Sequence, residues 1–276
     1  MQKGLLYTGT IGGIVGVIMA ATGIAWGYLF FRYFAEMMTQ MMSLTSLTTY
    51  LYDTLGYGAM SGILAAAILP SPSSGIVFLM ASVFLSMLLV INGILVGLGF
   101  HDVAQEGKGL LGTICLGACI IGALLTGALL VLGSALQITM LYNPMVSVTT
   151  YVPLPVSFLE FTLLWRGLAV LGAVLIIVGI TSIAVRKSVD CTESALLAGV
   201  LGIIAGILSI LQVIPLLTVM PSVYSFMFST TLSISDIVVP IFGMTASLIW
   251  IFMTFALCLV AYIFWIRMFY SYGSQK

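Results

Sequence analysis

The sequence predicts an all-α integral membrane protein with six transmembrane helices, arranged as three helical hairpins. Hydrophobic residues make up 62% of the 276-residue chain and charged residues only 6%, whereas a soluble domain carries about 25% charged residues. Several apolar stretches are as long as a membrane-spanning helix requires, which is about 18 residues or more. Short charged segments alternate between them with longer connections rich in Ser, Thr, Tyr and Met.

Six stretches are long and apolar enough to be spans, at about 5–25, 76–100, 110–136, 167–185, 195–217 and 240–264. The first exceeds the h-region of a signal peptide, so we interpret it as a retained span. After it, residues 36–54 mix Met, Leu and Tyr with Thr, Ser and Gln, which is typical of an interfacial helix or a helix–turn. Residues 55–69 are apolar but short for a span, and therefore indicate a re-entrant or interfacial segment.

Aromatic and basic residues cluster at the ends of several spans, where amphipathic rings and long basic side chains favour the membrane–water boundary. We expect boundary positions at the end of the first span, the head of the fourth and the end of the sixth. The residues concerned are Trp26, Tyr28, Phe30, Phe31, Arg32, Tyr33, Trp165, Arg166, Trp265 and Arg267.

The basic residues predict the orientation of the chain in a cell membrane. With both termini cytoplasmic, only Arg32 and Arg166 lie outside, and the remaining basic residues lie inside: Lys3, Lys108, Arg186, Lys187, Arg267 and Lys276. This distribution obeys the positive-inside rule. If residues 55–69 were counted as a seventh span, Lys108, Arg186 and Lys187 would lie outside, against this rule.

A threefold internal repeat within a single transmembrane domain, residues 1–276, is a second prediction. The hairpin units are roughly 1–107, 108–193 and 194–276, and each opens with a Leu-Leu pair. Each predicted outer connection also carries a threonine pair before a hydrophobic residue: Thr48, Thr49 and Tyr50; Thr149, Thr150 and Tyr151; Thr230, Thr231 and Leu232. The alternative is that these short matches between the units arise by chance, because the sequence consists mainly of a few apolar residue types.

The predicted outer connections are the candidate place for contacts with a partner or solute, through these threonine and tyrosine residues. Boundary ion pairs are expected in the same layer, among Arg32, Glu36, Asp53, Glu160, Arg166 and Asp236. The test of this hypothesis is whether the threonine pairs are needed for assembly or uptake.

Amides within the apolar stretches are a third set of candidates, namely Asn92, Gln137 and Gln212. Polar side chains inside a membrane mark transport paths or bond across helices, and the second interpretation is favoured. Met37, Met38, Met41 and Met42 are weak candidates for Cu(I), since thioethers suit that ion; filling an apolar helix face is the favoured alternative.

No nucleophile–base set, phosphate loop, dinucleotide fingerprint or further metal motif occurs in the sequence, so we expect neither catalysis nor a cofactor. The formal net charge is zero, which gives no basic surface for nucleic acid. The expected partners are the lipid bilayer and other membrane protein subunits, or a second copy of the chain. We therefore expect a structural or accessory subunit of a membrane complex, with a small-solute permease or channel as the alternative.

Overall fold

The computed structural model describes residues 7–55, 72–105, 108–142, 154–189, 191–212, 214 and 234–275. Within these ranges the side chains are described for residues 7–33, 75–105, 108–136, 163–189, 191–212, 214, 246 and 249–274. The elements are α2 (Thr8–Leu55), α4 (Pro72–Ala104), α5 (Gly109–Tyr142), α7 (Leu154–Val185), the 3₁₀ turn η1 (Arg186–Ser188), α8 (Thr192–Leu211) and α10 (Ile234–Gln275).

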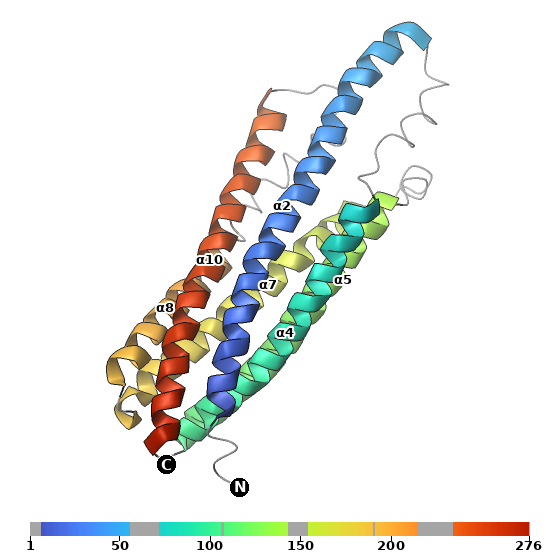
Figure 1. Cartoon of the computed structure of the whole chain (residues 1–276). Helices are drawn as coiled ribbons and strands as arrows, with labels where there is room; N and C mark the ends of the chain where they lie inside the picture. Colours follow the sequence, from blue (N-terminus) through green and yellow to red (C-terminus); the bar gives the residue numbers. More distant parts are fainter. Residues whose placement is uncertain are drawn as a thin grey trace.

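The described part of the chain holds six helices long and apolar enough to cross a membrane, which confirms the predicted class. The candidate spans are Thr8–Tyr33, Gly75–Ala104, Gly109–Leu136, Leu163–Ser188, Thr192–Leu211 and Ile249–Ser274. Helices suit this setting because each satisfies its own backbone hydrogen bonds where no water is available. Below, the end of the bundle at which both termini lie is called the terminal end, and the opposite end the distal end (Figure 1).

The six helices form a closed ring. Each packs against its neighbours in chain order, and α10 returns to pack against α2. Figure 1 shows α2 and α10 side by side, with both reaching past the distal ends of α4 and α5. Because every helix has two neighbours, this ring accommodates three hairpins, but the internal repeat stays a prediction.

Every helix except α8 extends further towards the distal end than the sequence predicts. Helix α2 runs unbroken to Leu55, so residues 36–54 form neither a separate interfacial helix nor a helix–turn. Helices α7 and α10 begin at Leu154 and Ile234, within stretches predicted as connections. A helix forms its own backbone hydrogen bonds in water as well as in lipid, so it need not end at the membrane boundary. The predicted re-entrant segment 55–69 lies, apart from Leu55, outside the described residues.

The fifth span is shorter than predicted, because α8 ends at Leu211. It is closely packed as well, since glycines bring its backbone onto α7. A Cβ at Gly206 would lie 2.5 Å from the carbonyl oxygen of Gly172, and one at Gly179 would lie 2.6 Å from that of Gly199. Small residues at helix contacts are how membrane helices approach closely.

The predicted boundary aromatics are divided between two environments. Tyr28 and Phe31 are exposed on the lipid-facing side of α2, but five others are buried in the core: Trp26, Phe30, Tyr33, Trp165 and Trp265. These five therefore face the interior of the bundle and not the lipid, while their depth at the membrane–water boundary stays a prediction. The reason is helical periodicity, since residues three or four apart share a face and consecutive aromatics point in different directions.

Candidate functional site

The predicted outer cap lies largely beyond what the structure describes. Residues 149–151 and 230–232 fall outside the described ranges, while Thr48, Thr49 and Tyr50 lie on the continuous helix α2. The first threonine pair is therefore part of a helix and not of a connection, which corrects the prediction for this unit. A contact role for the cap stays a prediction.

The methionine and boundary-charge candidates lie on helices, but most of their side chains are not among those described. The four methionines 37, 38, 41 and 42, with Glu36 and Asp53, are on α2; Glu160 is on α7 and Asp236 on α10. Gln137 is on α5, also without a described side chain. Arg32 and Arg166 are described, and both are exposed. Among the described residues, no group of three or more His, Cys, Asp or Glu could hold a metal ion.

Asn92 joins three helices at mid-height in the bundle. Its Nδ2 donates to the carbonyl oxygen of Gly12 on α2 at 2.7 Å, and its Oδ1 accepts from the Tyr262 hydroxyl of α10 at 2.6 Å. The Asn92 side chain is only 4% exposed, so these bonds replace the water that the amide would otherwise need.

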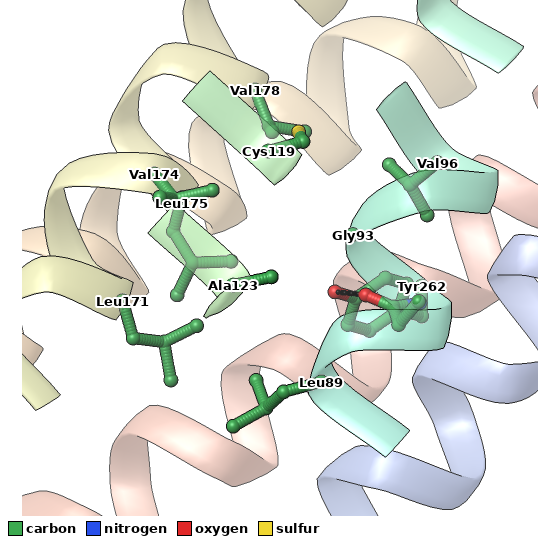
Figure 2. A pocket seen from close by; sticks show the side chains of 11 residues that line it. Leu89, Gly93, Val96, Cys119, Ala123, Leu171, Val174, Leu175, Val178 and Tyr262 are labelled. Carbon is green, nitrogen blue, oxygen red and sulfur yellow. Dashed lines mark hydrogen bonds between the residues drawn. The ribbon is translucent and has the colours of Figure 1, made fainter. Parts of the chain in front are cut away.

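A small cavity lies beside Asn92 and Tyr262 inside the ring (Figure 2). Of its eleven lining residues, Asn92, Cys119 and Tyr262 carry the polar atoms of the side chains, and the rest are glycine or aliphatic. Its volume of about 30 Å³ accommodates a water molecule, which needs about 10–15 Å³, but not a drug-sized ligand, which needs about 300 Å³ or more.

Aromatic rings fill the bundle on both sides of this cavity. Towards the distal end, Trp26, Phe30 and Phe78 pack together with centroids 5.7–5.8 Å apart, and Trp165 reaches Phe30 from across the ring at 5.9 Å. Towards the terminal end, Trp265 packs edge-to-face against Phe100 at 5.9 Å and against Tyr262 at 5.0 Å. Such pairs are favourable beyond the area that they bury. The cavity is thus enclosed between two aromatic clusters.

Polar side chains from five of the helices and from Gln212, the residue that caps α8, lie at one height in the distal half of the interior. This set, here called the polar layer, consists of Trp26, Ser82, Ser134, Trp165, Gln212 and Thr254, each at most 2% exposed. Half of the polar layer is hydrogen-bonded internally. The Ser82 hydroxyl accepts from Trp26 Nε1 at 2.8 Å and from the Ser134 hydroxyl at 2.7 Å.

Neighbouring contacts place the other three residues at the same height. Gly133, adjacent to Ser134, packs on Leu164, adjacent to Trp165: a Cβ at Gly133 would lie 2.9 Å from Leu164 Cγ. One turn towards the terminal end, the Ser209 hydroxyl donates to the carbonyl oxygen of Leu168 at 2.6 Å. Since α7 and α8 run antiparallel, Trp165 and Gln212 are the residues one turn further towards the distal end on each helix.

Thr254 reaches the same height through contacts between α10 and α2. It lies between Ile251 and Phe255 on α10. Ile251 packs on Gly27, with 3.2 Å from its Cγ2 to a Cβ built there, and the ring of Phe255 packs on Gly23. These glycines flank Trp26 on α2. Thr254 is therefore level with Trp26.

Three members of the polar layer keep hydrogen-bonding capacity that the described part of the protein does not use. These atoms are Trp165 Nε1, Gln212 Oε1 and Thr254 Oγ1, and none has a partner among the described residues. Gln212 Nε2 donates to the Ser209 hydroxyl at 3.4 Å, which leaves the Gln212 oxygen unused. Each unpaired buried polar group costs about 1–3 kcal/mol.

The chemistry available in this interior is neutral hydrogen bonding. Among the described residues, the buried polar side chains are Ser, Thr, Asn and Gln, together with the indole and phenol groups of Trp and Tyr. The arrangement can bind and orient an uncharged polar group. The carboxylate oxygen Oδ2 of Asp102 is buried too, but it lies at the terminal end of α4, away from this part of the interior.

Sequence reasoning identified Asn92, beside the cavity, and Gln212, but missed the other members of the polar layer. Trp26 and Trp165 were assigned to the boundary, and isolated hydroxyls in apolar stretches, such as Ser82 and Thr254, were not singled out. The available signal was partial: Ser82, Ser134 and Gln212 lie in the predicted outer thirds of the second, third and fifth spans, but Thr254 lies near the middle of the sixth, and the first and fourth spans contribute tryptophans instead. No known protein family, curated protein or solved structure matches this chain.

Proposed function

We propose that this polytopic membrane protein is a non-catalytic structural or accessory subunit of a membrane complex. The observation that carries the proposal is the length of α2, which has 48 residues. At 1.5 Å per residue this is about 72 Å, more than twice the roughly 30 Å of a bilayer core. Part of the helix must therefore lie outside the bilayer core, and we expect this part to be the continuation Phe34–Leu55, where Thr, Ser and Gln are mixed with apolar residues.

This continuation supports a role in protein contacts. Helix α10 lies beside α2 and, with 42 residues, is also about twice as long as a bilayer core requires. The two therefore present helical surface at the distal end. The enclosed interior supports the same role, because the described core is filled by aromatic clusters around a cavity of about 30 Å³.

The proposal is tested by photo-crosslinking in native membranes. We place p-benzoylphenylalanine at Met41 or Thr48 on the α2 continuation, and at Ile204, a lipid-facing position of α8 that is 42% exposed, as the matched control. The expected result is a crosslink from positions 41 and 48 to one defined membrane protein, identified by mass spectrometry, and none from position 204. Equal crosslinking from all three positions, or from none, contradicts the proposal.

A small-solute permease is the second candidate, and the polar layer is the observation that favours it. Unpaired donors and acceptors within a membrane bundle suit an uncharged polar solute. Purified protein in liposomes would then accelerate osmotic shrinkage and recovery in glycerol or urea, measured by light scattering. Solute flux equal to that of empty liposomes would exclude this candidate. The two aromatic clusters predict this result, because they close the interior on both sides of the cavity.

A further inference from the structure

We propose that Trp165, Gln212 and Thr254 form a binding site for an internal water molecule in the distal half of the bundle. This site is separate from the cavity beside Asn92 and does not depend on the proposed function. It rests on three side chains whose unused hydrogen-bonding atoms are buried and lie at one height, on α7, at the C-terminal cap of α8 and on α10.

The first step is burial. Trp165 and Thr254 are each 2% exposed and Gln212 is 1% exposed, so neither lipid headgroups nor bulk water reach their polar atoms. The Trp165 ring extends into the interior, since it contacts Phe30 of α2 from the other side of the ring at a centroid distance of 5.9 Å.

The second step is complementarity. Trp165 Nε1 is a donor only, Gln212 Oε1 is an acceptor only, and the Thr254 hydroxyl is both. A water molecule can accept from the indole, donate to the amide oxygen and pair with the hydroxyl, which gives the three hydrogen bonds typical of buried water. A single direct bond between two of the side chains would leave the third unpaired.

The third step concerns charge. Arg166 follows Trp165 in sequence but is exposed, and the buried polar residues that the structure describes are uncharged. An ion bound here would lack a counter-charge in a low-dielectric interior, which is strongly unfavourable. A neutral ligand is therefore the class that the site accepts.

The decisive experiment is NMR of the full chain in lipid nanodiscs, with ¹⁵N at the indole nitrogens of its four tryptophans. The variant Trp165→Phe assigns the Trp165 signal. Trp26 and Trp265 are internal references, because their indole N–H groups donate to Ser82 at 2.8 Å and Ser182 at 3.1 Å. We expect Trp165 N–H to show the shift of a hydrogen-bonded indole and, unlike Trp26, a magnetisation-transfer cross-peak to water.

Two results would overturn the proposal. The shift of a free indole N–H means that no ligand is bound. A hydrogen-bonded shift without a water cross-peak means that Trp165 bonds directly to a protein group.

A stability measurement tests the proposal independently, because bound water and unpaired atoms predict opposite changes of the thermal midpoint. If water is bound, Gln212→Met and Thr254→Val each remove a hydrogen bond and lower the thermal midpoint by about 2–4 °C. If the atoms are unpaired, the same changes remove a buried unsatisfied group and raise the midpoint, which contradicts the proposal. Thr22→Val is the matched control, since this exposed hydroxyl bonds to the carbonyl oxygen of Ile18 on its own helix.

Discussion

The hydroxyl of Tyr262 on α10 donates to the amide oxygen of Asn92 on α4 at 2.6 Å, although 170 positions separate the two residues in sequence. Because the Asn92 amide nitrogen bonds to Gly12 of α2, one side chain connects the first, second and last helices of the ring. It thereby helps to join the C-terminal helix to the start of the bundle.

Replacing Tyr262 by Phe should destabilise the protein by about 0.6–1.7 kcal/mol, the range found for hydrogen bonds between membrane helices. Asn92→Leu should also destabilise it, and the double variant should lose less than the sum, because removing both partners leaves no orphaned acceptor. Unfolding midpoints in mild detergent measure all three. Tyr270→Phe, at a site 62% exposed, is the control; strict additivity would argue that the bond is absent.

Glycine contacts between α7 and α8 give a prediction of packing. Gly206→Ala should cost about 1–3 kcal/mol, since the added methyl would lie 2.5 Å from the carbonyl oxygen of Gly172 and force the helices apart. Gly117→Ala on α5 is the matched control, because its Cβ meets nothing within 4 Å. That change should leave stability unchanged or raise it by up to about 1 kcal/mol, through helix propensity. Equal effects of the two variants would disagree with the described α7–α8 contact.

The predicted orientation is tested with single cysteines and a membrane-impermeant thiol reagent, in a Cys191→Ser background because Cys191 is partly exposed. Reagent added outside should label Thr45→Cys and Thr150→Cys but not Gln105→Cys, since a cytoplasmic terminal end places residue 105 inside. Labelling after permeabilisation confirms that residue 105 is reactive. Labelling of Gln105→Cys in intact cells would reverse the orientation.

The predicted cap is tested by replacing each threonine pair with Ala: Thr48 and Thr49, Thr149 and Thr150, and Thr230 and Thr231. If the cap contacts a partner, at least one double variant should reduce recovery of the native complex on gel filtration, while expression is maintained. Complex formation as in the wild type for all three variants would count against a contact role.

The sequence by itself determined the membrane class and the number of spans. Span length and apolar composition are local properties, set by bilayer thickness and by the cost of unpaired backbone groups. It was less accurate at the ends, because a stretch such as Phe34–Leu55, which mixes apolar and polar residues, is compatible in sequence with one helix or with two.

Only the tertiary structure decided which face of each span points inward. In a soluble helix the polar face identifies the exterior, but these helices are apolar all round, because lipid and core are similar solvents. Tyr28 and Trp26 are therefore indistinguishable in sequence, although one is 58% exposed and the other 2%. The polar layer forms only if each helix is rotated about its axis so that its polar residue faces inward. The places of Thr254 and Trp165 in this layer therefore follow from the closed ring of helices and not from the sequence.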